Sequence, residues 1–152
     1  MTYTTADGRH QLLDALAKAV GEIAVALSAL GEAYEQLDEQ TADRLEQELF
    51  RPVQAAYGRA QRTFGSFAER YGLPGRVFEQ APPGAPSTGA KGFIDLAVEA
   101  VARADQELAG LQDSMLPIEV GDEELRAGLQ EVRELLDAIR KRAKALERTL
   151  GR

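Results

Sequence analysis

The sequence predicts an all-α fold, in the form of an antiparallel up-down-up-down four-helix bundle with long helices. Apolar residues recur in steps of three and four along most of the chain, which is the spacing of one face of an α-helix. Alanine and leucine supply most of these positions, whereas the β-branched residues that favour strands are scarce. Two of the three connections between the periodic segments are short, and short connections join antiparallel neighbours.

The first two helices are expected over about residues 8–38, with Thr5 or Asp7 as N-cap, and about 42–71, with Thr41 as N-cap. Pro52 lies inside the apolar stripe of the second helix. A proline there removes one backbone hydrogen bond and collides with the carbonyl four residues earlier. Because the stripe stays in phase across Pro52, we predict one kinked helix rather than two.

Residues 72–92 break the helical pattern, since they hold four of the six prolines and five of the fourteen glycines. The part from 80 to 92 supplies no packing face, so we expect a flexible linker between two helical hairpins of a single domain, 1–152. The third helix is expected over about 93–115 and the fourth over about 122–150. The fourth has the clearest seam, with alternating steps of four and three at Leu125, Leu129, Val132, Leu136, Ile139, Ala143, Leu146 and Leu150.

The composition and charge of the chain exclude several classes of function. The net charge is -7 and the pI is about 4.8, so phosphate backbones repel the chain and nucleic-acid binding is not expected. The chain has no cysteine, which excludes disulfides, thiolate metal sites and cysteine nucleophiles. We find neither a signal peptide nor an apolar run that could span a membrane, and therefore expect a cytoplasmic protein. The abundance of alanine, glycine, arginine and glutamate is typical of a GC-rich bacterium.

Small residues gather on the outer faces of the first two helices. A glycine in an exposed helix interior destabilises the helix by about 1 kcal/mol relative to alanine, with no gain unless another backbone comes close. We therefore predict a homodimer built from these faces, the alternative being that they pack inside the monomer. The predicted interface consists of Ala17, Gly21, Ala24, Val25 and Ser28 on the first helix, and Gly58 and Gly65 on the second.

No catalytic constellation is found, and we expect neither an enzyme nor a cofactor or metal. Glu22 is the only charged residue between Ala19 and Gly31; it is either a buried carboxylate with a raised pKa or, as we favour, the partner of an arginine on a neighbouring helix. His10 is the sole histidine, which excludes histidine metal clusters. Residues 84–92 resemble a phosphate-binding loop only superficially, because Gly92 stands where a serine or threonine is required.

The end of the fourth helix is basic, with Arg140, Lys141, Arg142, Lys144, Arg148 and Arg152. Such a cluster binds an acidic partner, RNA or an anionic membrane, or it interacts only with the dipole of its own helix. We favour the dipole, because no aromatic residues are interleaved for base stacking.

The sequence alone leaves the function open between two hypotheses. The leading one is a non-enzymatic helical protein-interaction module that acts as an adaptor, regulator or assembly component, with an unidentified protein partner. The alternative is a small-molecule binding bundle, because aromatic and sulfur-containing side chains on the apolar stripes are suited to line a pocket. The residues of that predicted pocket are Tyr34, Tyr57, Phe64, Phe67 and Met115.

Overall fold

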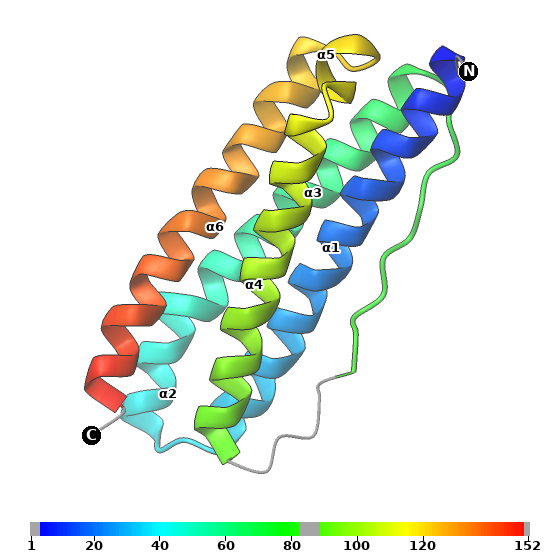
Figure 1. Ribbon diagram of the computed structural model, residues 1–152. Helices are drawn as coiled ribbons and strands as arrows, with labels where there is room; N and C mark the ends of the chain where they lie inside the picture. Colours follow the sequence, from blue (N-terminus) through cyan, green and yellow to red (C-terminus); the bar gives the residue numbers. More distant parts are fainter. Residues whose placement is uncertain (1–3, 83–88, 151–152) are drawn as a thin grey trace.

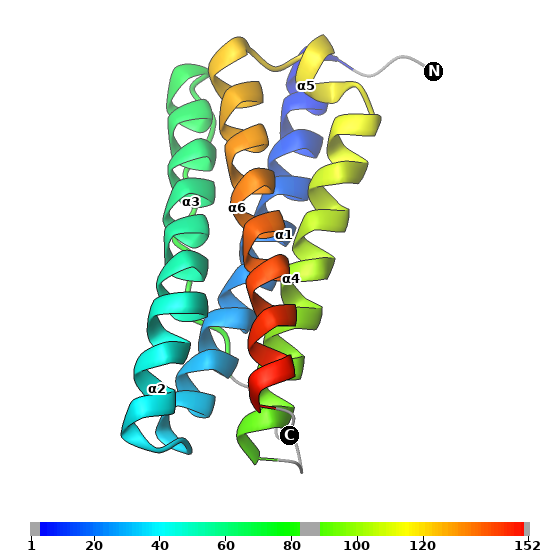
Figure 2. The same ribbon diagram turned by 90° about the vertical axis from the view of Figure 1, so that its left-hand side faces the viewer.

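The computed structural model describes residues 4–82 and 89–150, and every regular element in these ranges is helical. The elements are α1 (Thr5–Glu35), α2 (Glu39–Leu45), the π-helical turn η1 (Glu46–Phe50), α3 (Arg51–Arg70), α4 (Gly89–Asp113), α5 (Leu116–Glu119) and α6 (Glu123–Leu150). Because α2, η1 and α3 follow one another without a break, four long rods lie side by side (Figures 1 and 2). The predicted all-α class is confirmed.

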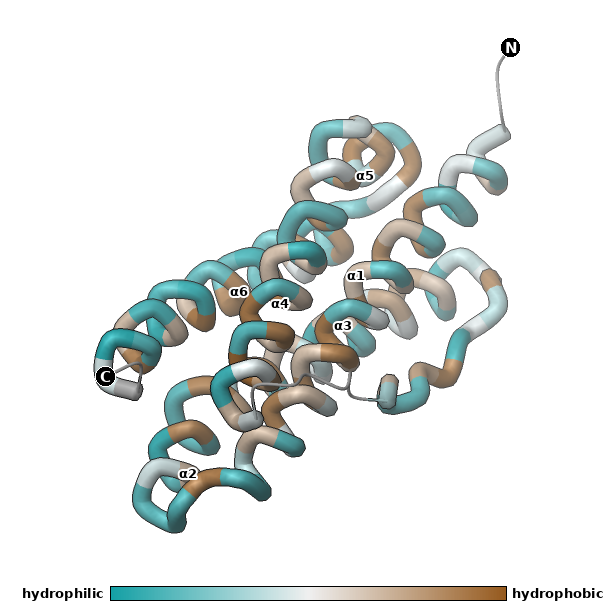
Figure 3. The backbone as a smooth tube through the Cα atoms, turned by 60° about the horizontal axis from the view of Figure 1, so that its bottom comes forward, coloured by the Kyte–Doolittle hydropathy of each residue, from teal (hydrophilic) through white to brown (hydrophobic). Residues whose placement is uncertain are grey.

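The apolar stripes of the four rods face one another and form one core. Figure 3 shows hydrophobic residues that recur at helical intervals along the rods. Burial of one large apolar side chain stabilises a fold by about 1.5–3 kcal/mol, so the core is the main source of stability. Its largest fully buried side chains are Phe64, Phe67, Leu12, Leu16, Ile23, Leu30, Leu45, Leu49, Leu108, Leu125, Leu129 and Leu136.

Side-chain caps fix where the first two rods begin. The Thr4 hydroxyl accepts from the Asp7 amide at 3.1 Å and the Asp7 carboxylate accepts from the Thr4 amide at 3.3 Å, which makes Thr4 the N-cap of α1. Asp38 caps α2 by accepting from the Thr41 amide at 3.3 Å. The expected N-caps Thr5, Asp7 and Thr41 are therefore wrong, although Asp7 and Thr41 take part in the capping hydrogen bonds.

A single π-helical turn accommodates Pro52 within the second rod. The Arg51 amide donates to the carbonyl of Glu46, five residues earlier, whereas an α-helix would use the carbonyl four residues earlier. This wider turn directly precedes Pro52, which has no amide hydrogen to continue the α-helical ladder. Leu49 and Val53, on either side of the proline, both remain buried in the core. The chain thus continues as one rod across Pro52, as the phase of its stripe predicts.

The long connection between α3 and α4 reverses the predicted order of helix directions. Ion pairs from Glu22 to Arg103 and from Lys18 to Glu107 show that α4 runs antiparallel to α1. The rod of α3 is also antiparallel to α1, because the short turn between α1 and α2 joins them. α3 and α4 therefore run in the same direction, and the expected up-down-up-down order is wrong (Figure 1). The 18 residues between α3 and α4 can span up to ~60 Å when extended. This exceeds the ~46 Å length of α1, so the connection is long enough for a crossover.

Residues 73–82 form an extended segment, here called the strap, that runs along α1 (Figure 1). The Phe78 ring meets the Phe64 ring edge-on with centroids 5.2 Å apart, and Arg76 forms an ion pair with Asp14 at 3.3 Å. The Ser28 hydroxyl donates to the carbonyl of Ala81. α4 begins at Gly89, before the expected start, and Gly92 is buried. Ala81, Ala90 and Gly92 therefore take part in packing, contrary to the expectation for residues 80–92; residues 83–88 lie outside the described ranges.

The two ends of the molecule differ in their connections. At one end α3 meets the start of α6, and at the other the turn between α1 and α2 lies near the start of α4 and the end of α6 (Figures 1 and 2). Within the described residues, no helix combines the length and the apolarity needed to cross a membrane.

Candidate functional site

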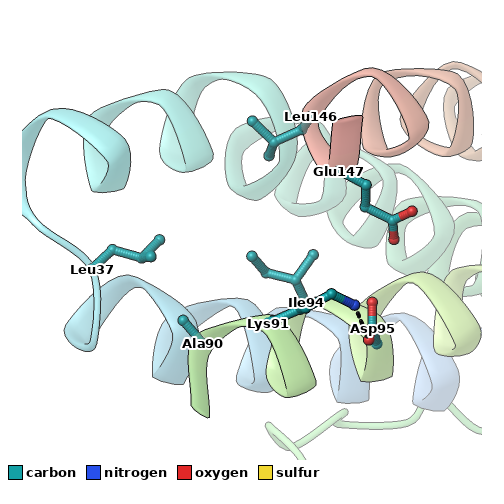
Figure 4. A pocket seen from close by; sticks show the side chains of 7 residues that line it. All are labelled: Leu37, Ala90, Lys91, Ile94, Asp95, Leu146 and Glu147. Atoms are coloured by element: carbon teal, nitrogen blue, oxygen red, sulfur yellow. Dashed lines mark hydrogen bonds and ion pairs between the residues drawn. The ribbon is translucent and has the colours of Figure 1, made fainter. Parts of the chain in front are cut away.

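An apolar hollow of about 140 Å³ lies at the end where α1 finishes, α4 starts and α6 finishes. Leu37 contributes from the turn after α1, and Leu146 from the last turns of α6. Figure 4 shows the side chains of Leu37, Ile94 and Leu146 directed toward the same space. We call this cavity the apolar hollow; its lining consists of Leu37, Ala90, Lys91, Ile94, Asp95, Leu146 and Glu147.

The inner surface of the apolar hollow is formed by apolar side chains, and charged side chains lie at its rim. Ile94 and Leu146 are buried, whereas Leu37 and Ala90 are half-buried and border the opening. On the rim, the Lys91 ammonium donates to the Asp95 carboxylate at 3.1 Å, one turn along α4 (Figure 4). Glu147 projects from α6 on the opposite wall. Apolar contact inside and charge outside suit a ligand that inserts an apolar group and keeps its polar part in water.

A second hollow, of about 280 Å³, lies between the last turn of α1 and the π-helical turn. We call it the acidic hollow; its lining consists of Gly31, Tyr34, Glu35, Glu46 and Phe50. Tyr34 is 37% exposed, and the Glu46 carboxylate accepts from the Arg51 guanidinium at 3.4 Å. Two aromatic rings and two carboxylates thus share one surface depression.

The opposite end carries a cluster of paired charges centred on Asp122. Its carboxylate accepts two hydrogen bonds from the Arg70 guanidinium, at 2.8 and 2.9 Å, and one from the Tyr71 hydroxyl at 2.9 Å. It also accepts from the Leu125 amide at 2.8 Å and so caps α6. The Arg70 guanidinium is the main reason that the pKa of Asp122 falls to about 2.

Other side chains complete this cluster and leave it without a free reactive group. The Arg9 guanidinium stacks on the Tyr71 ring at 3.9 Å and donates to the Val120 carbonyl at 3.0 Å. The hydrogen bond to Asp122 raises the pKa of Tyr71, because ionised tyrosine cannot donate it. Each charged group in the cluster has a partner, so the arrangement ties α1, α3 and α6 together.

A polar groove between α4 and α6 is likewise occupied by ion pairs. The Arg133 guanidinium donates to Asp105 at 2.9 Å and to the Gln112 amide oxygen at 2.8 Å. Arg140 approaches the same Asp105 carboxylate at 3.4 Å. The hydrogen bond to Asp105 raises the pKa of Arg133, which stays charged. The paired charges of this groove join α4 to α6.

Glu22 lies where the favoured hypothesis placed it. Its carboxylate accepts from the Arg103 guanidinium of α4 at 2.7 Å, and its side chain is 25% exposed. It is therefore an ion-pair partner at the edge of the core rather than a fully buried carboxylate. His10 is exposed on α1.

The structure does not bring the five residues of the predicted aromatic pocket together. Phe64 and Phe67 are packed inside the core, and Tyr57 is partly buried beside it. Tyr34 lies at the end of α1, whereas Met115 follows α4 at the opposite end of the molecule and is 48% exposed. Only Tyr34 lines one of the two hollows described above.

The small residues of the predicted dimer interface separate into two groups. Ala17, Ala24 and Ser28 are buried within one chain, and the Ser28 hydroxyl donates to the carbonyl of Ala81 in the strap. The backbone that comes close at Ser28 therefore belongs to the same chain. The remaining four are at least partly exposed: Gly21, Val25, Gly58 and Gly65.

Sequence reasoning missed the apolar hollow and the role of Asp122. Leu37 and Leu146 occupy ordinary stripe positions and Ile94 directly follows Phe93, so nothing in the sequence separates them from other core residues. Asp122 stands three residues before the first leucine of the fourth stripe, which is an N-cap signal, but its partners Arg70 and Tyr71 lie 52 and 51 residues away.

The described residues contain no group of three or more histidine, aspartate or glutamate side chains placed to hold a metal ion. The chain matches no protein-family model, no curated protein and no solved structure.

Proposed function

We propose that the chain is a non-enzymatic helical protein-interaction module, which binds a protein partner by accepting one apolar side chain in the apolar hollow. From the composition we further propose that the protein acts in a bacterial cytoplasm. There it would serve as an adaptor, a regulator or an assembly component. The observation that carries the proposal is the size and chemistry of the hollow shown in Figure 4.

The volume of the apolar hollow favours a side chain over a metabolite. Small-molecule sites usually enclose about 300–1,000 Å³ and add several converging polar groups. The hollow encloses about 140 Å³, and an apolar cavity of ~150 Å³ holds a group the size of benzene. One leucine or phenylalanine side chain of a partner fits this space. A buried apolar anchor with a polar rim is the usual centre of a protein interface.

Filling the hollow tests the proposal. Ala90→Phe places an aromatic ring where the partner side chain is expected, and Ala127→Phe, at an exposed position on α6, is the matched control. The measurement is quantitative affinity capture from native cells with each immobilised variant. We expect wild type and Ala127→Phe to retain one stoichiometric protein, and Ala90→Phe to retain at least tenfold less. Equal capture by all three would contradict the proposal.

A ligand screen tests the alternative that the hollow binds a small molecule rather than a protein side chain. A metabolite at a hundred times its dissociation constant stabilises its target by ~2.7 kcal/mol. Thermal stabilisation of wild type but not of Ala90→Phe by a metabolite would assign the hollow to a small molecule instead.

A further inference from the structure

One side of the apolar hollow is acidic. Leu37, which lines the hollow, lies in a stretch where Glu35, Asp38 and Glu39 are exposed and no basic residue stands between them. Each of these carboxylates is within two residues of Leu37 along the chain, and the three are here called the acidic border. Among the described residues, no ion pair involves the acidic border, so its negative charge is not compensated within the chain.

The wall of the hollow that α6 forms is basic. Glu147 lines the hollow, and Lys144 lies next to it, because residues three apart are neighbours on a helix surface. Lys144 and Arg148 are both exposed and lie one turn apart; they are here called the basic border. The helix dipole acts within the last turn, and Lys144 stands six residues before the end of α6 at Leu150, so the dipole does not account for it. In the described part of the chain, neither cation forms an ion pair.

The hollow separates the two borders. Figure 4 shows Leu37 and Glu147 on opposite sides of the space into which Ile94 and Leu146 are directed. Within the described residues, α1 and α6 make no direct helix–helix contact, so the acidic and basic borders belong to rods that do not touch. A segment that enters the hollow therefore meets a negative surface on one side and a positive surface on the other.

The size of the hollow keeps the charges of a partner outside it. A space of about 140 Å³ holds one side chain, so the residues that flank this anchor remain at the rim, in water. At physiological salt the screening length is ~8 Å, so only charges within a few residues of the anchor interact with the borders. Opposite charges attract such a segment and like charges disfavour it, which makes the flanking charges the source of specificity.

We infer that the apolar hollow accepts a segment of another protein in which one apolar anchor stands between a basic stretch and an acidic stretch. The basic stretch of the partner lies over the acidic border and its acidic stretch lies over the basic border. The two borders thus also fix the direction in which the segment lies. The inference rests on the proposed function, since it describes the partner of the same hollow.

Synthetic peptides test this charge pattern on the full chain. Each peptide has one phenylalanine between two alanines. The divided peptide carries three lysines on one side and three glutamates on the other, and it is made in both orders because the backbone direction is not specified. The lysine peptide and the glutamate peptide carry one kind of charge on both sides. In a fourth peptide, alanine replaces the phenylalanine of the divided peptide.

The readout is the amide chemical shifts of the nitrogen-15-labelled chain at low salt. Shifts at Ala90, Ile94 and Leu146, which line the hollow, report binding at this place. We expect the better order of the divided peptide to bind about tenfold more tightly than the lysine or the glutamate peptide, because several exposed charge pairs of modest strength add up. In 1 M salt, where the screening length falls to ~3 Å, the three phenylalanine peptides are expected to bind alike.

Reversing one border at a time is a second test. Lys144→Glu with Arg148→Glu makes both sides of the hollow acidic and is expected to move the preference to the lysine peptide. Glu35→Lys with Glu39→Lys makes both sides basic and is expected to move the preference to the glutamate peptide. Circular dichroism confirms that each variant folds.

A matched control separates the borders from net charge. Glu69→Lys with Glu119→Lys changes the net charge as much as the reversal of the acidic border, at exposed sites of the opposite end, and is expected to keep the wild-type preference. Equal binding of the three phenylalanine peptides at low salt, or a preference that border reversal leaves unchanged, would overturn the inference. A wild type that sediments as a dimer, which the divided peptide dissociates, would also overturn it, because the occupant would be a second copy. The proposed function fails separately, if phenylalanine peptides bind no more tightly than the alanine peptide or if Ala90→Phe leaves their binding unchanged.

Discussion

The two ends of this four-rod molecule differ in the side-chain hydrogen bonds that join the rods. At the end centred on Asp122, here called the closed end, hydrogen bonds join Arg9 to Val120, and Arg70 and Tyr71 to Asp122. At the end around Leu37, here called the open end, no ion pair or side-chain hydrogen bond among the described residues joins α1 or its following turn to α4 or α6. Two hollows lie there, whereas the closed end has one depression of about 290 Å³ beside the exposed Ile118.

This difference supports the open end as the place where we propose that a partner binds. A cluster whose groups are all paired stabilises the fold and offers little to a partner, because a new contact must first break an old one. An end with apolar surface and uncompensated charge gains free energy when a partner covers it. The side-chain hydrogen bonds centred on Asp122 thus lie at the closed end, and the open end is where we propose that a partner binds.

Truncation of one leucine at each end gives the largest expected effect. Leu125, at the closed end, is completely buried, and Leu125→Ala is expected to lower the free energy of unfolding by about 3–4 kcal/mol because it leaves a new cavity. Leu146 already borders the apolar hollow, so Leu146→Ala is expected to lower it by about 2 kcal/mol. Urea unfolding monitored by circular dichroism measures both. Equal losses would show that the open end is packed as tightly as the closed end.

Neutralising Asp122 is expected to remove about 1–2 kcal/mol at pH 7, a range that allows for solvent screening of a partly exposed pair. The folded pKa is about 2 and the unfolded value is near 3.8. The carboxylate therefore contributes fully above about pH 4, and its contribution fades as the pH falls from 4 to 2. Urea unfolding at several pH values is expected to show that the difference between Asp122→Asn and wild type shrinks toward zero as the pH falls through 2. A constant difference between pH 7 and pH 2 would assign the effect to something other than this charge.

The periodicity of the sequence predicts the helices but not the directions in which they run relative to one another. A stripe such as Leu125 to Leu146 reports only that one face is buried, and each rod found its face in the shared core. The direction of α4 depends on the path of the linker, whose length permits either a hairpin or a crossover. The strap selects the crossover through Phe78, which packs on Phe64, and through Ala81, whose carbonyl accepts from Ser28; neither strap residue belongs to a periodic pattern.

The candidate site was beyond sequence reasoning for a related physical reason. Ser28 meets a backbone carbonyl of the strap, and the spacing of the small residues on α1 does not tell a second copy from a strap of the same chain. The apolar hollow is a space left between three rods, and its position depends on where each rod ends. Helix ends are the least predictable feature, since α4 starts at Gly89 within a segment whose composition favours a loop.

Gly128 tests how tightly the rods pack toward the closed end. A Cβ atom at this position would lie 2.5 Å from the Thr63 hydroxyl oxygen and 2.8 Å from its methyl group, where α6 crosses α3. Gly128→Ala is therefore expected to destabilise the protein by about 1–2 kcal/mol, despite its better helix propensity. In a Thr63→Ala background the same change is expected to be neutral or stabilising, because the colliding atoms are gone. Denaturant unfolding of the four proteins gives the coupling energy, and simple additivity would contradict the contact.

Filling the open end is expected to have the smallest effect on stability and the opposite sign. Ala90→Leu adds three carbons at the border of the apolar hollow, where space of about 140 Å³ exists, so the new atoms gain contacts without displacing others. We expect unfolding free energy to rise by less than about 1 kcal/mol, as for other cavity-filling substitutions. The matched comparison is Gly128→Ala, a smaller addition that meets occupied space. Thermal or denaturant unfolding of both variants decides the point: a loss for Ala90→Leu as large as that for Gly128→Ala would mean that the open end has no room for a partner side chain.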